Sequence, residues 1–567
     1  MRTIYRLTSV LLLFVFSAFF TVYAGTNNSE AEYRKLSETY TLNPDGSQEY
    51  RYYMELSLFT HTAMNRTYGE SFIIYNPEYQ ELKIHNSYTV QKDGKIIKTP
   101  ENAFVEVLPS QAADAPAYNH LKEMVVVHTG LELGATIYLD YSLISKPGYT
   151  PELDVCIPVK RTSPIKNYTV TISVPDSKPL YYSLTNNKVK PSVKTVNGTK
   201  QVTWTINNVE AASREPGSSG IAGDLYFLTA TSYPSVKDAL SYLNTQFFQN
   251  NSTELSNLAS DITKGKNTDT EKLQAILNYI VDNLAFSRLT IQETGFRIRP
   301  VKDVLNSMYG TEAEKINLLA DLLNVSGIKT EIVAAFHRNI HELSYGLNSI
   351  HEIFIIAETG GKRYYINPKT KNMADAAWYP GYAGYISISN PGKSLSIDQP
   401  STALDFSFDI MLSPDKAEIK ASGKTGSAFI SYTVNNSTSN FSITIPLQNN
   451  NGYIILTLPD VADGNLRTYK DYNSKRKENL LLPYMADEKT IYTINVPGNM
   501  KLVTTEYKKV INNSVGNLEI SVKQNGGKIE IISNFKINKQ LITPADYKNF
   551  KELITERGGI KMLFNVI

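Results

Sequence analysis

The sequence predicts a multidomain α+β fold, with an all-β domain at each end of the chain and a mixed α+β core between them. The 567 residues are too many for one hydrophobic core, since a domain of about 150 residues is typical. Apolar and polar residues alternate in both outer parts, whereas apolar residues recur every three or four positions in the middle. We expect an N-terminal antiparallel β domain at 25–232, an α+β core at 233–392 and a C-terminal β-sandwich at 393–567.

The first 24 residues predict a secretory signal peptide. Arg2 and Arg6 precede an apolar run from Leu7 to Ala24, which ends in a small-x-Ala cleavage site before Gly25. The alternative is an uncleaved membrane anchor, because the run approaches spanning length. We expect cleavage, an exported protein and no stable membrane span afterwards.

The composition gives no reason to expect nucleic-acid binding and excludes an internal disulfide. Hydrophobic residues make up 42% and charged residues 20%, as in ordinary globular proteins. A net charge of +2 gives no electrostatic reason to expect nucleic acid as a partner. Cys156 is the single cysteine, so no internal disulfide is available, and we expect Cys156 to be a small buried hydrophobe.

Two-residue periodicity predicts the strands of the outer domains. In the N-terminal part, Glu49–Leu58, Glu81–Ile84 and Thr136–Tyr141 alternate, and turn sequences such as 92–95 separate the runs. In the C-terminal part, Ala417–Gly423 and Leu518–Val522 alternate in the same way, and a last helix begins within 543–550. The spacing predicts sheets in both parts.

The core begins with helices and continues into a region rich in site residues. Helices are predicted at Asp238–Phe248 and Asp269–Leu284, followed by an irregular arm at Ile291–Pro300. Gly310-Thr311-Glu312 then leads into an apolar helix, Ile316–Leu323, which stops at Gly327-Ile328. Three further features follow in order: a strand at Lys329–Phe336, a strand containing His351, and the sequence Tyr364-Tyr365-Ile366-Asn367-Pro368.

This region resembles the core of the transglutaminase-like superfamily, a branch of the papain-like cysteine hydrolases. Members read Gly-x-Cys-x-x-x-Ala before a Leu-rich helix that ends in Gly-Ile, then a strand carrying His and a strand ending in Asp-Pro. The resemblance implies a catalytic Cys, His and Asp at 312, 351 and 367. Here these positions hold Glu312, His351 and Asn367, so only the histidine is retained.

The flanking parts carry a second resemblance. The segments 76–82, 134–137, 157–161 and 168–175 are similar, in this order, to an N-terminal β domain of unknown function that precedes such cores in bacterial envelope proteins. The last part resembles the β-sandwich that often follows them. These resemblances imply a bacterial protein located in the periplasm or at the cell surface.

The residue at position 312 decides the expected chemistry. Enzymes of this type attack an amide with a thiolate held at a helix N-terminus, whereas a carboxylate is a poor nucleophile toward amides. Loss of the nucleophile costs about a million-fold in rate in a comparable serine enzyme. We expect Thr311 and Glu312 to cap the helix, an effect worth up to about 1 kcal/mol. We also expect Glu312 to pair with His351, whose ring Asn367 would orient.

Two other sets of residues suggest binding or catalysis. His337, His341 and Glu342 suggest a metal or acid–base site, because two histidines four apart on a helix face the same metal. An aromatic segment suggests a stacking platform for a sugar or peptide, or else a linker packed on the core. Its members are Trp378, Tyr379, Tyr382 and Tyr385.

We therefore predict a non-catalytic transglutaminase-like protein, a pseudoenzyme, that binds a peptide, protein or glycan in the cell envelope and needs no metal or cofactor. The alternative is an active transglutaminase-like amidase or protease, or a metal-assisted hydrolase, with an unconventional site. Turnover that depends on His351 would favour the alternative.

Overall fold

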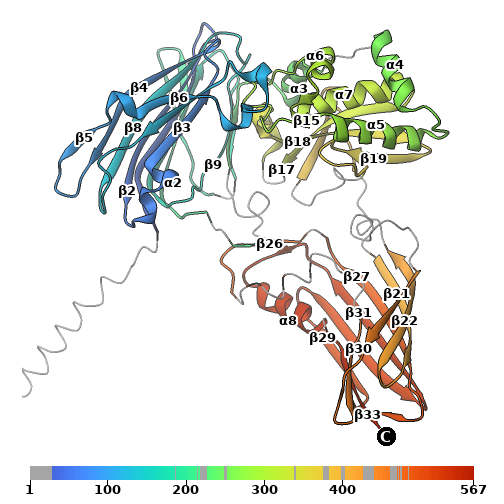
Figure 1. The fold of residues 1–567 in the computed structure, drawn as a ribbon. Helices are drawn as coiled ribbons and strands as arrows, with labels where there is room; N and C mark the ends of the chain where they lie inside the picture. The colour runs from blue at the N-terminus through green and yellow to red at the C-terminus, as the bar shows by residue number, and fades with distance from the viewer. Residues whose placement is uncertain are drawn as a thin grey trace, which may run out of the picture.

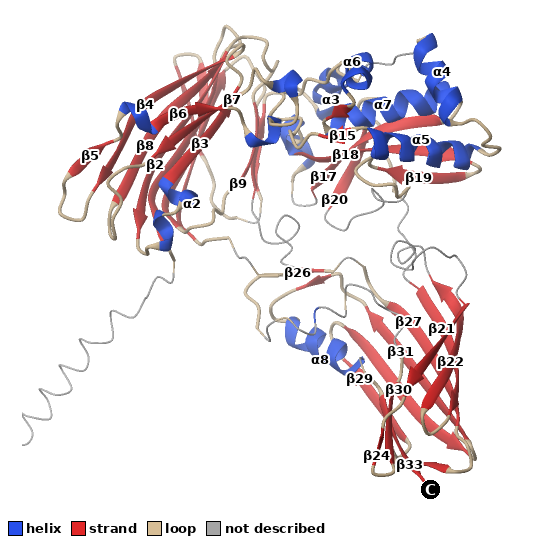
Figure 2. Ribbon diagram, in the orientation of Figure 1, coloured by secondary structure: helices blue, strands red, loops and turns tan. Residues whose placement is uncertain are grey.

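The computed structural model describes residues 29–567 except 186, 213–214, 217–226, 248–251, 338–339, 374–381, 398–402, 426–439, 460–465, 467–468, 470–471, 473–474, 483 and 558. The predicted signal peptide therefore lies outside the described residues. Among the helices that are described, none is both long and apolar enough to cross a membrane. Figures 1 and 2 display two β-rich parts and a core in which helices cover a sheet.

The N-terminal part is built on an eight-stranded sheet with the order β12-β13-β10-β1-β2-β8-β4-β5. The sheet is antiparallel as predicted, except that β1 and β10 pair in parallel. The strands are β1 (Ala31–Leu42), β2 (Gln48–Leu58), β4 (Gln80–Val90), β5 (Ile96–Lys98), β8 (Thr136–Ser145), β10 (Ile165–Pro175), β12 (Ser192–Val196) and β13 (Thr199–Val209).

Two three-stranded sheets and several short helices complete this part. One sheet has the order β3-β7-β6 and the other β11-β14-β9. Their strands are β3 (Glu70–Tyr75), β6 (Phe104–Val107), β7 (Lys122–Val127), β9 (Asp154–Pro158), β11 (Tyr181–Leu184) and β14 (Phe227–Thr231). The helices are η1 (Thr62–Met64), α2 (Arg66–Gly69), η2 (Glu101–Ala103), η3 (Ser110–Ala112) and η4 (Pro116–Tyr118).

In the core, helices lie over one face of a four-stranded antiparallel sheet with the order β19-β18-β17-β20 (Figure 1). Every residue of the central helix from Ala313 to Leu323 is buried, so this helix is the centre of the core. The helices are α3 (Val236–Asn244), α4 (Thr253–Ile262), α5 (Asp269–Asn283), α6 (Val301–Ser307) and α7 (Glu312–Val325).

The remaining core elements place the site residues. The strands are β15 (Ala285–Phe286), β16 (Tyr309–Gly310), β17 (Lys329–His337), β18 (Ile350–Thr359), β19 (Lys362–Ile366) and β20 (Tyr382–Ser387). Two 3-10 helices, η5 (Glu342–Ser344) and η6 (Leu347–Ser349), connect β17 to β18. The left-handed φ of +84° at Gly327 ends the turn after α7, the conformation that makes glycine common at this position.

The C-terminal part has a seven-stranded sheet with the order β23-β22-β21-β27-β31-β30-β29 and a smaller sheet with the order β24-β25-β33-β28. A third pair is β26-β32, and α8 (Tyr547–Arg557) contacts β30. The strands are β21 (Ala403–Leu412), β22 (Lys416–Thr425), β23 (Asn440–Pro446), β24 (Asn449–Asn450), β25 (Tyr453–Thr457), β26 (Leu480–Leu481), β27 (Asp487–Asn495), β28 (Met500–Leu502), β29 (Tyr507–Asn512), β30 (Gly516–Asn525), β31 (Lys528–Ile537), β32 (Leu541–Ile542) and β33 (Lys561–Val566).

Ion pairs and hydrogen bonds join the three parts. Nζ of Lys160 lies 3.2 Å from Oε1 of Glu478, and both side chains are only 9% exposed. The Tyr118 hydroxyl donates to Oε1 of Glu314 in the core at 2.5 Å. Buried polar contacts of this kind are costly to break on one side only.

Candidate functional site

Glu312 is the first residue of α7, as its place in the sequence predicts. The hydroxyl of Thr311, the N-cap residue, accepts from the main-chain N–H of Glu314 at 3.3 Å. The N-terminus of a helix carries a partial positive charge, which stabilises a carboxylate at this position. The Glu312 side chain is 29% exposed, so it faces the surface of the core, whereas the next two residues are buried.

Glu314 stabilises the start of α7 through buried hydrogen bonds. It is fully buried, and its carboxylate accepts from the Thr311 N–H at 2.8 Å, which completes a capping box. Arg299 donates to both of its oxygens, at 2.7 and 3.1 Å, and the Tyr118 hydroxyl adds a further bond at 2.5 Å. The buried charge is thus paired and fully hydrogen-bonded.

Asn367 follows β19 and is 3% exposed. Its Nδ2 donates to Oε1 of Glu312 at 2.5 Å and lies 3.3 Å from both Oε1 of Glu352 and the carbonyl oxygen of Ile353. An amide nitrogen has only two hydrogens, so these three acceptors use its whole capacity. Its Oδ1, the atom that would accept an imidazole N–H, accepts from the main-chain N–H of Lys369 at 3.3 Å. Among the described residues no hydrogen bond joins Asn367 to His351, so the expected orienting contact is not formed.

Glu312 also has a different partner from the one expected. Nζ of Lys369 lies 2.8 Å from Oε2 of Glu312. Within the part of the chain that the structure describes, no ion pair joins Glu312 to His351, so the expected pair is not formed. Lys369 stands two residues after Asn367, and both side chains converge on the same carboxylate.

His351 is the extra residue of a β-bulge in β18. Ala335 of β17 pairs with Glu352 and Phe336 pairs with Ile350, which leaves His351 between them. Bulges re-aim a side chain and are common beside active sites. Burial lowers the pKa of His351, and the Lys369 ammonium lowers it further, against the opposing effect of Glu312. These effects favour the neutral imidazole, consistent with the missing ion pair.

Glu352 is a site residue that the sequence did not reveal. Its Oε2 accepts from the Tyr382 hydroxyl at 2.9 Å. Burial raises its pKa, the Tyr382 hydrogen bond lowers it, and the nearby Glu312 charge raises it again. The only sequence signal for Glu352 was its position beside His351, and that for Lys369 was its position after Asn367-Pro368.

The predicted histidine pair does not form on a helix. His337 ends β17, is 4% exposed and has its ring centroid 3.9 Å from that of His351 and 5.7 Å from that of Phe227. His341 is exposed and caps η5, where its Nδ1 accepts from the N–H of Leu343 at 3.3 Å. Glu342 is also exposed, within η5. Among the described residues, no three His, Cys, Asp or Glu side chains gather as metal ligands.

The predicted aromatic platform is not exposed where the structure describes it. Trp378 and Tyr379 lie outside the described residues. Tyr382 and Tyr385 belong to β20 and are only 7% and 8% exposed, packed on the sheet face opposite the helices. Both are core residues, so their rings are not available for stacking on a ligand.

The N-terminal part of the chain is hydrogen-bonded to the segment that precedes His351. Oδ2 of Asp154 in β9 accepts from the N–H of Asn348 at 2.5 Å, and Nδ2 of Asn348 donates to the carbonyl of Asp154 at 2.7 Å. Gly346 permits this approach, because a Cβ there would lie 1.8 Å from Oδ1 of Asp154. Burial raises the pKa of Asp154 to about 7, against the hydrogen bonds that lower it.

Cys156 lies in the same strand, β9, and is half-buried against the core. Burial, with a smaller contribution from the charge of Asp154, raises the pKa of its thiol to about 12. A thiol with a raised pKa holds little thiolate at neutral pH and is inert. The expectation of a structural role fits this environment, although Cys156 is less buried than expected.

Comparisons with known proteins agree with this architecture. Three family models match: DUF3857, a domain of unknown function, over residues 44–213; the transglutaminase-like superfamily core over 256–378; and DUF3858, another domain of unknown function, over 451–558. No curated protein matches the chain. The predicted domain boundaries themselves remain predictions.

Among solved structures, a protein from Parabacteroides distasonis ATCC 8503, described as a candidate protease, is 39% identical. The match covers 95% of this chain and 99% of that one, with a TM-score of 0.77. A candidate cysteine protease from Cytophaga hutchinsonii is 12% identical, over 53% of this chain and 90% of that one, with a TM-score of 0.20. The second similarity is too weak to support an argument.

In a papain-like core, the N-terminus of a central helix faces a strand that carries a histidine and the residue that follows the next strand. Here these elements are α7, β18 with His351, and Asn367 after β19. The chain belongs to the transglutaminase-like superfamily, in the arrangement DUF3857, transglutaminase-like core and DUF3858. The fold class predicted from the sequence is confirmed.

Proposed function

We propose that this protein is an exported, non-catalytic member of its superfamily that binds an extended peptide or protein segment in the cell envelope. The observation that carries the proposal is the bonding of Glu312. This carboxylate stands at the nucleophile position and is held by Asn367 at 2.5 Å and Lys369 at 2.8 Å. A carboxylate engaged in this way is a weaker nucleophile still than a free one.

Within the described part of the chain, His351 lacks the partner that catalysis would need. A triad requires a group that holds the imidazole in one tautomer and orientation, and its loss costs about ten-thousand-fold in rate even where nucleophile and base remain. Here Asn367 donates to Glu312 and Glu352 instead of bonding to His351. Glu312 at the nucleophile position and Asn367 at the orienting position thus bond to each other and not to His351. This supports loss of covalent catalysis.

The strand that carries His351 offers a place for a ligand. Pairing with β19 begins at Ile355, so among the described strands Ile350 and the residues 352–354 pair only with β17, and the bulged His351 pairs with neither strand. The free side of such a segment can accept an extended peptide by main-chain hydrogen bonds. One of its carbonyls, that of Ile353, is engaged by Asn367. The remaining positions support binding of a short extended segment beside His351.

One experiment tests the loss of catalysis. Amidase and transglutaminase turnover are measured for the wild type and His351→Ala, with and without added zinc, and binding of a randomised pentapeptide pool is measured on the same samples. We expect no turnover in either protein and saturable peptide binding in both. Wild-type turnover that His351→Ala abolishes would reject the proposal.

A second candidate, hydrolysis by an acid–base pair without a covalent intermediate, is favoured by Glu352. Burial raises the pKa of Glu352, which favours its acid form, while Glu312, bonded to the same Asn367 amide, would serve as the base. The description of the Parabacteroides relative as a candidate protease fits this alternative. Turnover that Glu352→Gln removes would establish it over the binding function.

A further inference from the structure

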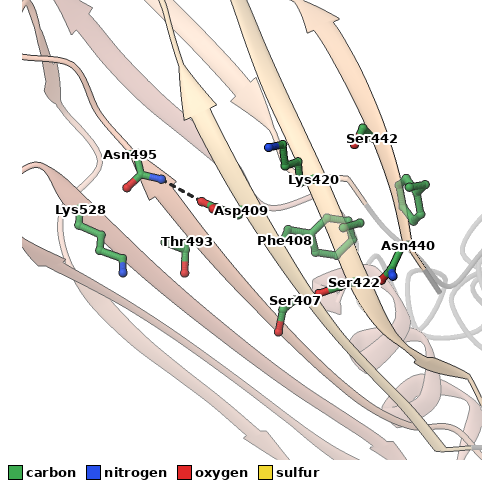
Figure 3. A pocket seen from close by; sticks show the side chains of 12 residues that line it. Ser407, Phe408, Asp409, Lys420, Ser422, Asn440, Ser442, Thr493, Asn495 and Lys528 are labelled. Carbon is green, nitrogen blue, oxygen red and sulfur yellow. Dashed lines mark hydrogen bonds between the residues drawn. The ribbon is translucent and has the colours of Figure 1, made fainter. Parts of the chain in front are cut away.

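A hollow crosses the outer face of the seven-stranded C-terminal sheet, far along the chain from the core site (Figure 3). It extends over β23, β22, β21 and β27 to the start of β31, with a volume of about 790 Å³. Ligand pockets are typically about 300–1,000 Å³. The hollow is therefore large enough for a ligand of several rings.

Most of the side chains that line the hollow are polar. Along β21, Phe406, Phe408 and Ile410 are buried, whereas the alternating Ser407 and Asp409 are exposed on the outer face. The Phe408 ring contacts the rings of Tyr492 and Phe441, with centroids 4.9 and 6.2 Å apart. Phe408 and Tyr492 are buried, whereas Phe441 is 42% exposed and lines the hollow. A ligand in the hollow would therefore meet hydroxyl, amide and charged groups together with one exposed aromatic ring.

Short side chains explain why the sheet is hollowed here. Ser407 is directly opposite Ser422 on β22, and Ser442 on β23 is opposite Lys420. The outer face of a sheet usually carries longer polar side chains, which would fill this space. Three serines at its centre leave hydroxyl groups, each a donor and an acceptor, on the floor of the hollow.

The hollow carries an excess of positive charge. Lys420 and Lys528 are exposed, and neither takes part in an ion pair within the described part of the chain. Asp409 accepts from the Asn495 amide at 2.9 Å (Figure 3). Glu418, farther along β22, is paired with Lys416 at 2.7 Å. Among the residues that line the hollow, two ammonium groups thus face one carboxylate, and the exposed Glu530, opposite Thr493, stands just outside this set. The lining itself favours an anionic ligand.

We propose that this hollow binds an acidic oligosaccharide, whose sugar carboxylates pair with Lys420 and Lys528 and whose hydroxyls bond to the serines and to Asn440. Charge-assisted hydrogen bonds are about twice as strong as neutral ones, so the lysines supply affinity. The serine floor supplies recognition of hydroxyl groups, which a small inorganic anion lacks. This site lies in a different domain from the proposed peptide-binding site and is independent of it.

The test is isothermal titration of the whole chain with three probes. Trigalacturonate carries both carboxylates and hydroxyls, cellotriose carries hydroxyls only, and inorganic tripolyphosphate carries charge only. We expect saturable binding of trigalacturonate and at least tenfold weaker binding of the other two. Added salt is expected to weaken the trigalacturonate complex, because its carboxylates are held by exposed charges.

Matched variants separate the hollow from the general surface. Lys420→Ala and Lys528→Ala are each expected to weaken trigalacturonate binding at least tenfold, while Lys489→Ala, an exposed lysine on the same face of β27, leaves it unchanged. Ser407→Phe fills the floor without changing charge and is expected to abolish binding. Unfolding curves followed by circular dichroism verify that each variant is folded.

The proposal fails if trigalacturonate does not bind, if tripolyphosphate binds as tightly, or if both lysine variants keep wild-type affinity. Titration of Glu312→Gln and His351→Ala with trigalacturonate distinguishes the two sites. Unchanged affinity in those variants supports a separate site, and loss of binding would overturn it.

Discussion

Nδ2 of Asn367 lies 2.5 Å from Oε1 of Glu312, so the residue at the orienting position bonds to the residue at the nucleophile position. In a working triad both groups would act on the histidine and the substrate. Here they satisfy each other, with Lys369 completing the pairing of the carboxylate. The two replacements are thus coupled, and reversing one alone leaves the other without its partner.

The first prediction concerns Glu312→Cys. A thiol at the N-terminus of α7, with Lys369 nearby, is expected to have a pKa below the usual value of about 8.5. Its alkylation by iodoacetamide at pH 7 should therefore be at least tenfold faster than that of Cys156, whose pKa is raised to about 12. Wild type, which contains only Cys156, is the control. Equal rates would show that the environment of position 312 no longer activates a thiol.

Restoring both positions is expected to do more. In Glu312→Cys/Asn367→Asp the aspartate regains a negative charge that can pair with His351, so amidase or transglutaminase turnover should appear above that of Glu312→Cys. Adding His351→Ala should remove it. If the double variant is alkylated rapidly but shows no turnover, the cleft no longer positions a substrate.

The second prediction concerns the titration of His351. The Lys369 ammonium lowers the pKa of His351, so Lys369→Ala should raise it. Glu312→Gln should lower it, because the Glu312 charge acts in the opposite direction. Proton NMR titration of the imidazole measures both shifts. Lys371→Ala, which removes an exposed lysine paired with Asp282, should change neither.

The third prediction concerns pH and Asp154. Its folded-state pKa of about 7 lies above the unfolded value of about 3.9. The folded state therefore binds the proton more tightly, and this stabilisation is complete below about pH 4 and lost as pH rises through about 7. Asp154→Asn mimics the protonated form. The unfolding free energy of Asp154→Asn minus that of wild type should therefore rise by about 2–4 kcal/mol between pH 4 and pH 8.

The measurement for Asp154 is urea unfolding at pH 4, 6 and 8. Cys156 and Tyr233 also sense the charge of Asp154, and both keep their protons throughout this range because burial raises their pKa values. They therefore add no titration of their own. A stability difference between wild type and Asp154→Asn that is constant across pH would contradict the prediction.

The fourth prediction concerns Glu314. Replacing this carboxylate by Gln leaves Arg299 without its charged partner beneath α7, and breaking a buried pair on one side costs about 3–5 kcal/mol. The expected result is a lower urea midpoint for unfolding of the core. Glu312→Gln is the matched control two residues earlier, and since its side chain is 29% exposed, it should cost less than about 1 kcal/mol.

The fifth prediction concerns Gly346. In Gly346→Ala the new Cβ would lie 1.8 Å from Oδ1 of Asp154, so β9 and the segment before His351 must separate. We expect a lower melting temperature and faster hydrogen exchange at Asn348. Gly498→Ala is the control, because a Cβ there has no atom within 4 Å. Equal melting temperatures would mean that the two segments adjust without cost.

Much of the fold could be predicted from the sequence because periodicity reflects burial directly. The alternation in Ala417–Gly423 predicted β22, and the helical spacing after Asp269 predicted α5. The parallel pairing of β1 with β10 could not be predicted in this way, since alternation determines which face of a strand is buried but not its neighbour.

The site was predicted only in part, for a reason that Tyr382 and Tyr385 illustrate. Residues three apart in a regular strand point to opposite faces. The pairing of β20 with β17 shifts between Phe336 and His337, where Ala383 is the extra residue, and this bulge turns both tyrosines to one face. The bulge at His351 is likewise invisible in the sequence. Side-chain partners such as Lys369 depend on these local shifts.

The contact between Asp154 and Asn348 has a consequence for dissecting this chain. A fragment beginning near residue 233 would retain every strand and helix of the core yet lose the outside support for the turn that leads into His351. The three parts match separate family models, but hydrogen bonds from the first support the turn before His351 in the second. A shortened protein meant to report on the cleft must therefore include the N-terminal module.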